Sequence, residues 1–105
     1  MSLIFLMPYF LPLAVPISDL AKLSSLPVTA EWFTLGIQLG LPLYHLRIIQ
    51  RNNVHYPDMA GRCLVDMFHF WIISDCISTY EGLATALNAI GRNDLALEVC
   101  REKSK

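Results

Sequence analysis

The residues able to do chemistry are few in this chain and lie scattered along it. They are three histidines and three cysteines: His45, His55, His69, Cys63, Cys76 and Cys100. His69 follows Cys63 by six residues, whereas metal ligands on one helix stand three or four residues apart. Each cysteine has apolar neighbours, which is typical of a small buried side chain. We therefore expect no bound metal ion and no catalysis by cysteine or histidine.

Other catalytic and ligand-binding signatures are missing as well. No Gly-x-Ser-x-Gly turn supports a Ser/His/Asp arrangement, and the five glycines are too isolated to form a phosphate-binding loop. A helical domain this short fills its interior with side chains. We expect no enzymatic activity, no cofactor and no small-molecule substrate.

Charged side chains give the stronger functional signal. Arg47 and Arg51 stand four residues apart and share one face of a helix, where like charges repel slightly unless a partner's carboxylates lie opposite. Oppositely charged patches of this kind would let protein copies dock, although an ordinary solvated surface is the simpler interpretation. The candidate partner-binding residues are Arg47, Arg51, Asp66, Asp75, Glu81, Arg92 and Asp94.

Composition limits the remaining possibilities. The chain has 105 residues, of which 54% are hydrophobic and 16% charged, so it fits one folded domain and excludes extensive disorder. Its net charge of -1 gives no basic field for binding nucleic acid. Three cysteines without repeated spacing argue against a disulfide scaffold.

Residues 1–17 are apolar, carry no charged side chain and contain Pro8, Pro12 and Pro16. They are shorter than the ~20 residues of a membrane-spanning helix, and prolines disfavour a helix there. Three interpretations stay open: an apolar extension packed loosely on the domain, a secretory signal, and an anchor at the membrane surface. No domain is assigned to this segment, and membrane attachment is not the favoured interpretation.

From residue 18 onward, helical spacing of apolar residues predicts six short helices and no strand. The expected helices cover residues 18–26, 30–39, 42–51, 59–73, 78–90 and 93–100. Ser18, Asp58 and Asn93 are expected N-caps, and Ser78 with Glu81 matches a capping box. Gly40 and Gly91 are expected to end helices in the left-handed conformation. The expected core residues are Leu20, Leu23, Leu26, Trp32, Leu35, Leu39, Leu43, Leu46, Ile49, Met59, Leu64, Met67, Phe68, Trp71, Leu83, Leu87, Ile90, Leu95, Ala96 and Val99.

Five motifs follow one another in order along the predicted helices: Trp32-x-x-Leu35-Gly36-x-x-Leu39-Gly40-Leu41, Leu46-x-x-Ile49, Cys63-Leu64 before Met67-Phe68-x-x-Trp71, Ser78-Thr79-Tyr80-x-x-Leu83-x-x-Ala86-Leu87, and Gly91-Arg92-x-Asp94-Leu95-Ala96. This ordered set resembles the death domain, a six-helix antiparallel bundle with Greek-key helical architecture. The resemblance spans residues 18–102. The apolar start of the third helix, Pro42-Leu43-Tyr44, departs from the acidic start of many family members.

The resemblance implies a cytoplasmic, non-enzymatic adaptor or regulator in apoptotic or innate-immune signalling. Its partners would be other death-domain proteins or copies of itself, bound through the candidate charged residues. The alternative is a small helical protein attached to a membrane, or directed through it, by residues 1–17.

Overall fold

The computed structural model describes residues 14–74 and 78–104. Six α-helices occupy most of this part of the chain: α2 (Leu20–Ser24), α3 (Trp32–Gln38), α4 (Leu43–Asn53), α5 (Met59–Ile73), α6 (Tyr80–Ala89) and α7 (Asn93–Ser104). Two 3-10 turns, η1 (Ile17–Asp19) and η2 (Thr29–Glu31), lead into α2 and α3. Within the described residues there is no β-strand beyond one isolated bridge between Ala14 and Thr79. The expected all-helical class is confirmed.

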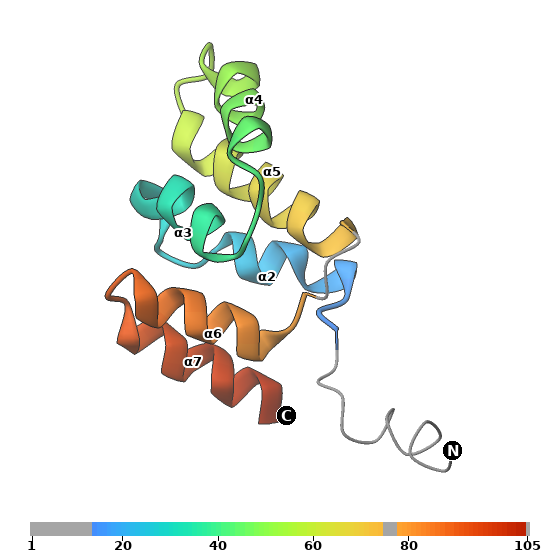
Figure 1. Cartoon of the computed structure of the whole chain (residues 1–105), viewed down its shortest axis with the longest axis vertical. Helices are drawn as coiled ribbons and strands as arrows, with labels where there is room; N and C mark the ends of the chain where they lie inside the picture. The colour runs from blue at the N-terminus through green and yellow to red at the C-terminus, as the bar shows by residue number, and fades with distance from the viewer. Residues whose placement is uncertain (1–13, 75–77, 105) are drawn as a thin grey trace.

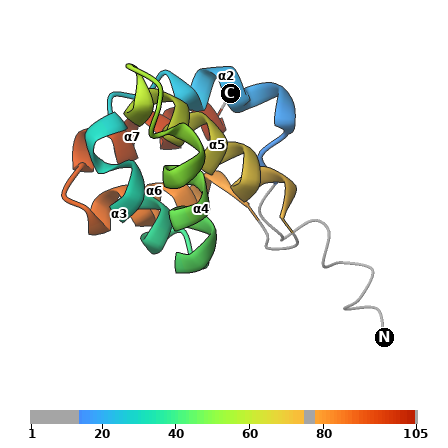
Figure 2. The same cartoon turned by 90° about the horizontal axis from the view of Figure 1, so that it is seen from above.

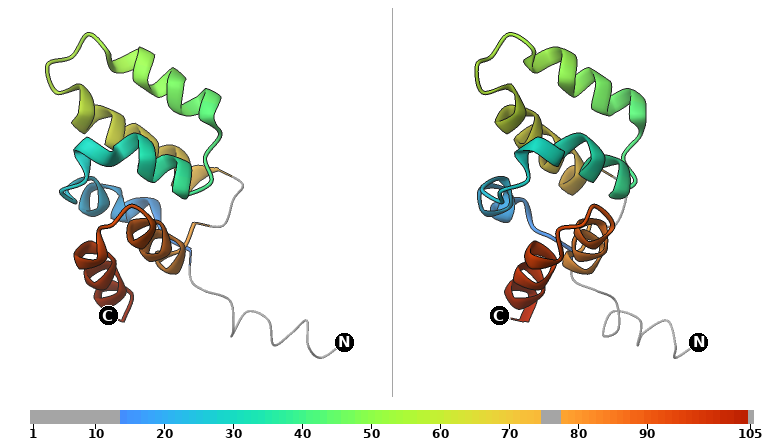
Figure 3. Two further views of the ribbon diagram at one scale, coloured as in Figure 1. Left: turned by 60° about the vertical axis from the view of Figure 1, so that its left-hand side comes forward. Right: turned by 90° about the vertical axis from the view of Figure 1, so that its left-hand side faces the viewer.

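Helix α5 is the centre of the fold. It packs against α2, α3 and α4, while α6 and α7 form a closely packed pair on the far side of α2 and α3 (Figure 1). Figure 3 shows α4 at one end of the molecule and α7 at the other, and the view along the long axis in Figure 2 looks onto α4 with α6 and α7 behind it. No helix in the described ranges combines the length and the apolar character needed to cross a bilayer.

The core follows from the spacing of large apolar residues on α5. Leu64, Met67, Phe68 and Trp71 recur at helical spacing, and all four side chains are buried as expected. Cys63 lies on the same face and is also buried. Most of the other expected core residues are buried too, but Leu43 is exposed. Five more are only partly buried and pack against the edge of the core: Leu20, Leu26, Leu39, Met59 and Ile90.

Leu43 was expected to be buried but is 45% exposed. The buried face of α4 is centred on Leu46, Ile49 and Asn53, and this places Leu43 at its edge. Asn53 is buried because its side-chain amide has two acceptors: Nδ2 donates to the Ile49 carbonyl at 2.8 Å and to Asp66 Oδ2 at 2.9 Å.

The expected N-caps are mostly wrong, whereas the glycine terminators are confirmed. Gly40 and Gly91 have φ of 87° and 85°, the left-handed conformation that ends a helix. Ser18 lies inside η1, whereas Asp58 stands at the expected N-cap position of α5 but forms no side-chain cap hydrogen bond there. Asn93 is the first residue of α7.

The start of α6 differs from the expected capping box. Thr79 is the N-cap, and its hydroxyl accepts a hydrogen bond from the Gly82 N–H at 3.0 Å. Ser78 is buried, and its carbonyl accepts a hydrogen bond from the Val15 N–H at 2.7 Å. Val15 is itself buried, so the described part of the apolar N-terminal segment packs beside the start of α6.

Candidate functional site

The outward side of α4 carries a row of cationic and apolar side chains, the α4 stripe, formed by Tyr44, Arg47, Ile48 and Arg51. These positions have the i, i+3, i+4, i+7 spacing of one helix face, and all four residues are exposed, Tyr44 by 69% and Ile48 by 40%. The helix contains no acidic residue. Within the described chain, neither guanidinium is joined to another residue by a hydrogen bond or ion pair. The stripe is therefore a positively charged surface with apolar contacts available.

Asp66 belongs to α5 and lines a groove between α4 and α5, so it is separate from the α4 stripe. Besides Asp66, the groove is lined by residues of both helices, including His45, Ile48, His69 and Phe70. The His45 ring stacks on the Phe70 ring with centroids 3.5 Å apart. Oδ2 of Asp66 holds the Asn53 amide, so this carboxylate already contributes to the α4–α5 packing.

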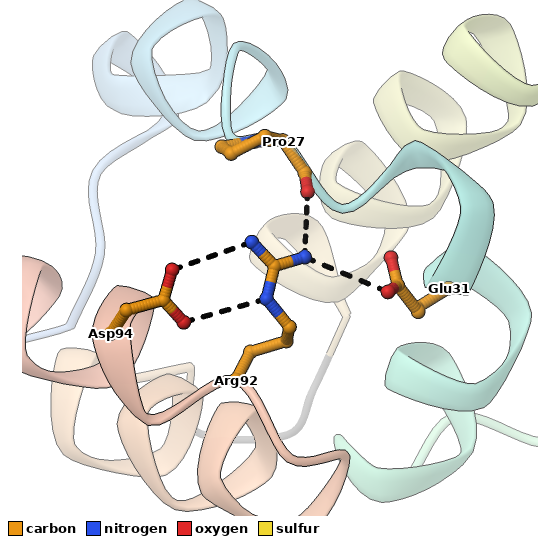
Figure 4. A network of polar contacts seen from close by, with 4 residues as sticks. All are labelled: Pro27, Glu31, Arg92 and Asp94. Carbon is orange, nitrogen blue, oxygen red and sulfur yellow. Dashed lines mark hydrogen bonds and ion pairs between the residues drawn. The ribbon is translucent and has the colours of Figure 1, made fainter.

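Arg92 joins the turn before α7 to the segment before α3, as Figure 4 shows. Its Nη1 donates to the Pro27 carbonyl at 2.8 Å and lies 3.5 Å from the Glu31 carboxylate. Its Nε lies 3.4 Å from Asp94 Oδ1. The guanidinium lowers the pKa of the Asp94 carboxyl, mainly through these hydrogen bonds, and Asp94 in turn raises the pKa of Arg92. Arg92 thus stabilises the packing of its own domain.

The structure brings together only some of the sequence-predicted charged residues. Arg47 and Arg51 are neighbours on α4, and Arg92 and Asp94 form an ion pair. Glu81 lies in the first turn of α6 and is half-buried. Asp75 lies outside the described residues.

Sequence reasoning missed a row of residues on the outward side of α7, the α7 stripe, formed by Asp94, Leu97, Glu98 and Arg101. All four are exposed, and Leu97 is exposed by 63%. The signal that could have found the row is its spacing, which repeats the spacing of the α4 stripe. Of the four, only Asp94 stands out in the sequence, because it flanks a predicted turn.

The environment of Cys63 disfavours the reactive thiolate form of its side chain. Burial raises the pKa of the Cys63 thiol, and the negative charge of Asp66 raises it further. Cys63 is buried as expected, whereas the expectation is wrong for Cys100, which is exposed on α7 because it follows the buried Val99 and faces away from the core. Cys76 lies outside the described residues. In residues 14–74 and 78–104, no three His, Cys, Asp or Glu side chains are grouped closely enough to hold a metal ion.

Comparisons of the chain with protein-family models, with curated proteins and with solved structures find no match. Function is therefore inferred from the fold and from the surface chemistry of α4 and α7.

Proposed function

We propose that this chain is a death-domain type interaction module that binds other death domains, or copies of itself, in intracellular signalling. One observation carries the proposal: most apolar residues of the motifs that resemble the death domain are buried, and they lie on five consecutive helices, α3 to α7, and in the turn after α3. The buried hydrophobic members of those motifs are Trp32, Leu35, Leu41, Leu46, Ile49, Cys63, Leu64, Met67, Phe68, Trp71, Leu83, Ala86, Leu87, Leu95 and Ala96.

The positions of the motifs support the same proposal. The tryptophan motif begins α3 at Trp32 and includes Gly40, where the backbone turns left-handed after the helix. The glycine of the last motif, Gly91, ends α6 in the same way. Each motif therefore supplies either core contacts or a helix end, as expected if the six-helix antiparallel death fold is correct.

The surface chemistry fits a protein that works by association. The α4 stripe offers two guanidiniums beside exposed Tyr44 and Ile48, a mixture of arginine, aromatic and aliphatic groups that is typical of interface hot spots. Acidic residues lie on other elements, among them Asp66 on α5 and Glu81 on α6. Contacts between unlike surfaces build open or helical assemblies rather than closed dimers. The chain would then act as an adaptor or as a regulator of such an assembly.

The test is light scattering behind size exclusion on the full chain, alone and mixed with each of a series of purified death domains. We expect a mass above the monomer, alone or in at least one mixture, that falls as salt rises, because salt screens exposed ion pairs. Arg47→Glu should reduce the mass. Arg62→Glu, which changes the net charge equally on α5, should leave it unchanged. A monomer alone and in every mixture would refute the proposed function.

A further inference from the structure

The α4 stripe and the α7 stripe have matching spacing and complementary chemistry. Each has four exposed positions at i, i+3, i+4 and i+7 of its helix. The two inner positions of the α4 stripe are Arg47 and Ile48, and those of the α7 stripe are Leu97 and Glu98. A cation and an aliphatic side chain on one helix therefore correspond to an anion and an aliphatic side chain on the other.

We propose that the α4 stripe of one copy of this chain docks antiparallel on the α7 stripe of the next copy. In this orientation each cation of the α4 stripe faces an anion of the α7 stripe, and the two aliphatic side chains face each other. The tyrosine ring of the α4 stripe faces the guanidinium of the α7 stripe, which is a favourable cation–π arrangement. The pairs are Tyr44 with Arg101, Arg47 with Glu98, Ile48 with Leu97 and Arg51 with Asp94.

The parallel orientation is disfavoured by the same residues. It would place Arg51 opposite Arg101, so two guanidiniums would repel each other. It would also place Ile48 opposite Glu98 and desolvate a carboxylate without a partner. The chemistry thus selects one direction for the helix pair.

The contact must form between copies rather than within one. Helix α4 packs against α3 and α5, α7 packs against α6, and the helices α4 and α7 lie at opposite ends of the molecule (Figures 1 and 3). A copy that uses its α4 stripe keeps its α7 stripe available for another copy. Such a head-to-tail contact between unlike surfaces propagates into an open series.

The four residue pairs should contribute unequally to the contact between copies. Asp94 is already held by Arg92 of its own chain, so Arg51 would share a carboxylate that has a partner. Glu98 is exposed and forms no hydrogen bond or ion pair with another described residue, which makes Arg47 with Glu98 the principal ion pair. A single helix pair is smaller than a standard stable interface, so the association should be weak and concentration-dependent.

This inference deepens the proposed function and depends on it. The experiment is sedimentation velocity of the full chain over a concentration series at low salt, with Arg47→Glu, Glu98→Arg and the double variant. Each single variant should weaken association about tenfold, because an attractive pair becomes a repulsive one. The double variant reverses the pair and should return to within about threefold of the wild type.

Two controls separate lost docking from lost folding. Far-UV circular dichroism and thermal unfolding should be unchanged in all three variants, because both side chains are exposed. An equimolar mixture of the two single variants should associate again, because Glu at position 47 of one then faces Arg at position 98 of the other. Arg62→Glu should associate like the wild type.

The outcomes distinguish this pairing from the proposed function. If the wild type associates but the single variants associate equally well, the α4–α7 pairing is wrong while homotypic assembly stands. If both single variants weaken association and neither the double variant nor the mixture restores it, the pairing is also wrong. If the wild type alone stays monomeric, copies do not dock, and the mixtures with purified death domains decide the proposed function separately.

Discussion

The contact between α3 and α4 provides a sharp test of the packing, because it depends on a glycine. Gly36 is buried in α3, and a Cβ added there would lie 2.7 Å from Leu46 Cδ2, 3.1 Å from Leu46 Cδ1 and 3.3 Å from Met67 Cγ. Carbon atoms in ordinary contact are about 3.5–4.0 Å apart, so one of them must shift by roughly 1 Å. Leu46 is fully buried and has little space in which to move.

Whether Gly36→Ala raises or lowers the free energy of unfolding should therefore depend on the side chain of Leu46. Alanine is favoured over glycine in a helix by about 1 kcal/mol. Overpacking a core costs about 1–3 kcal/mol. In the wild type the sum should lower the free energy of unfolding by about 1 kcal/mol. Leu46→Val removes both Cδ atoms, so in that background Gly36→Ala should raise the free energy of unfolding instead.

The measurement is urea unfolding of the four proteins that form this double-mutant cycle, followed by tryptophan fluorescence. Gly82→Ala in α6 serves as the control, because its Cβ would meet only Thr79 Oγ1, at 3.3 Å, and it lies outside the α3–α4 contact. The control should change stability equally in both backgrounds. If Gly36→Ala changes the free energy of unfolding in the same direction with leucine and with valine at position 46, the close approach of α3 and α4 is not what requires glycine.

Three further predictions concern a cap, an ion pair and a thiol. Thr79→Ala should lower the free energy of unfolding, measured in urea, by about 1 kcal/mol, because the hydroxyl caps α6. Thr79→Ser keeps a hydroxyl and should retain most of the wild-type stability. Because Arg92 lowers the pKa of Asp94 in the folded state, the stability from this pair is present above the unfolded-state pKa and is lost as pH falls through the folded-state pKa. The wild type should therefore exceed Asp94→Asn in Tm at neutral pH, and the difference should vanish in acid; a difference independent of pH would contradict the pairing. Iodoacetamide should modify Cys100 in the native protein and Cys63 only after unfolding, as mapped by mass spectrometry, because Cys63 is buried and its thiol pKa is raised.

The helices and most of the core could be predicted from the sequence because they depend on local periodicity. In α5 the large apolar residues recur with the helical period over 15 residues, which leaves one choice of buried face. Gly40 and Gly91 could be predicted for a related reason: each directly follows the apolar pattern of its helix and can take a positive φ at little cost.

The start of α6 could not be predicted, because a distant segment decides it. Ser78 and Thr79 are both good caps by residue type. The Val15 N–H donates to the Ser78 carbonyl, and Ala14 pairs with Thr79 in an isolated bridge. These contacts leave Thr79 extended, with φ of -130° and ψ of 159°, and the helix begins after it. Nothing near residue 78 in the sequence indicates that a segment more than 60 residues earlier lies beside it.

The candidate site shows the same division between local and distant information. Arg47 and Arg51 were predicted to share a face because helical spacing alone determines it. The role of Arg92 depends on Pro27, whose carbonyl it binds from 65 residues away, and the sequence gives no sign of this contact. Arg92 therefore looks, in the sequence, like any other charged residue on a turn.

Arg92, which is bonded within its own domain, and the exposed arginines of α4 should have opposite roles in function. The guanidinium of Arg92 contacts oxygen atoms of three residues of its own domain and its side chain is only 25% exposed, so most of its binding capacity is used by the fold. Arg47 lies on the outward face of α4 between exposed Tyr44 and Ile48, and the described chain supplies no acid to either of the two α4 guanidiniums. A charge that the fold does not use costs little to expose and gains most when a complementary surface arrives. Reversing Arg92 should therefore weaken the domain first, whereas reversing Arg47 should weaken association and leave the domain intact.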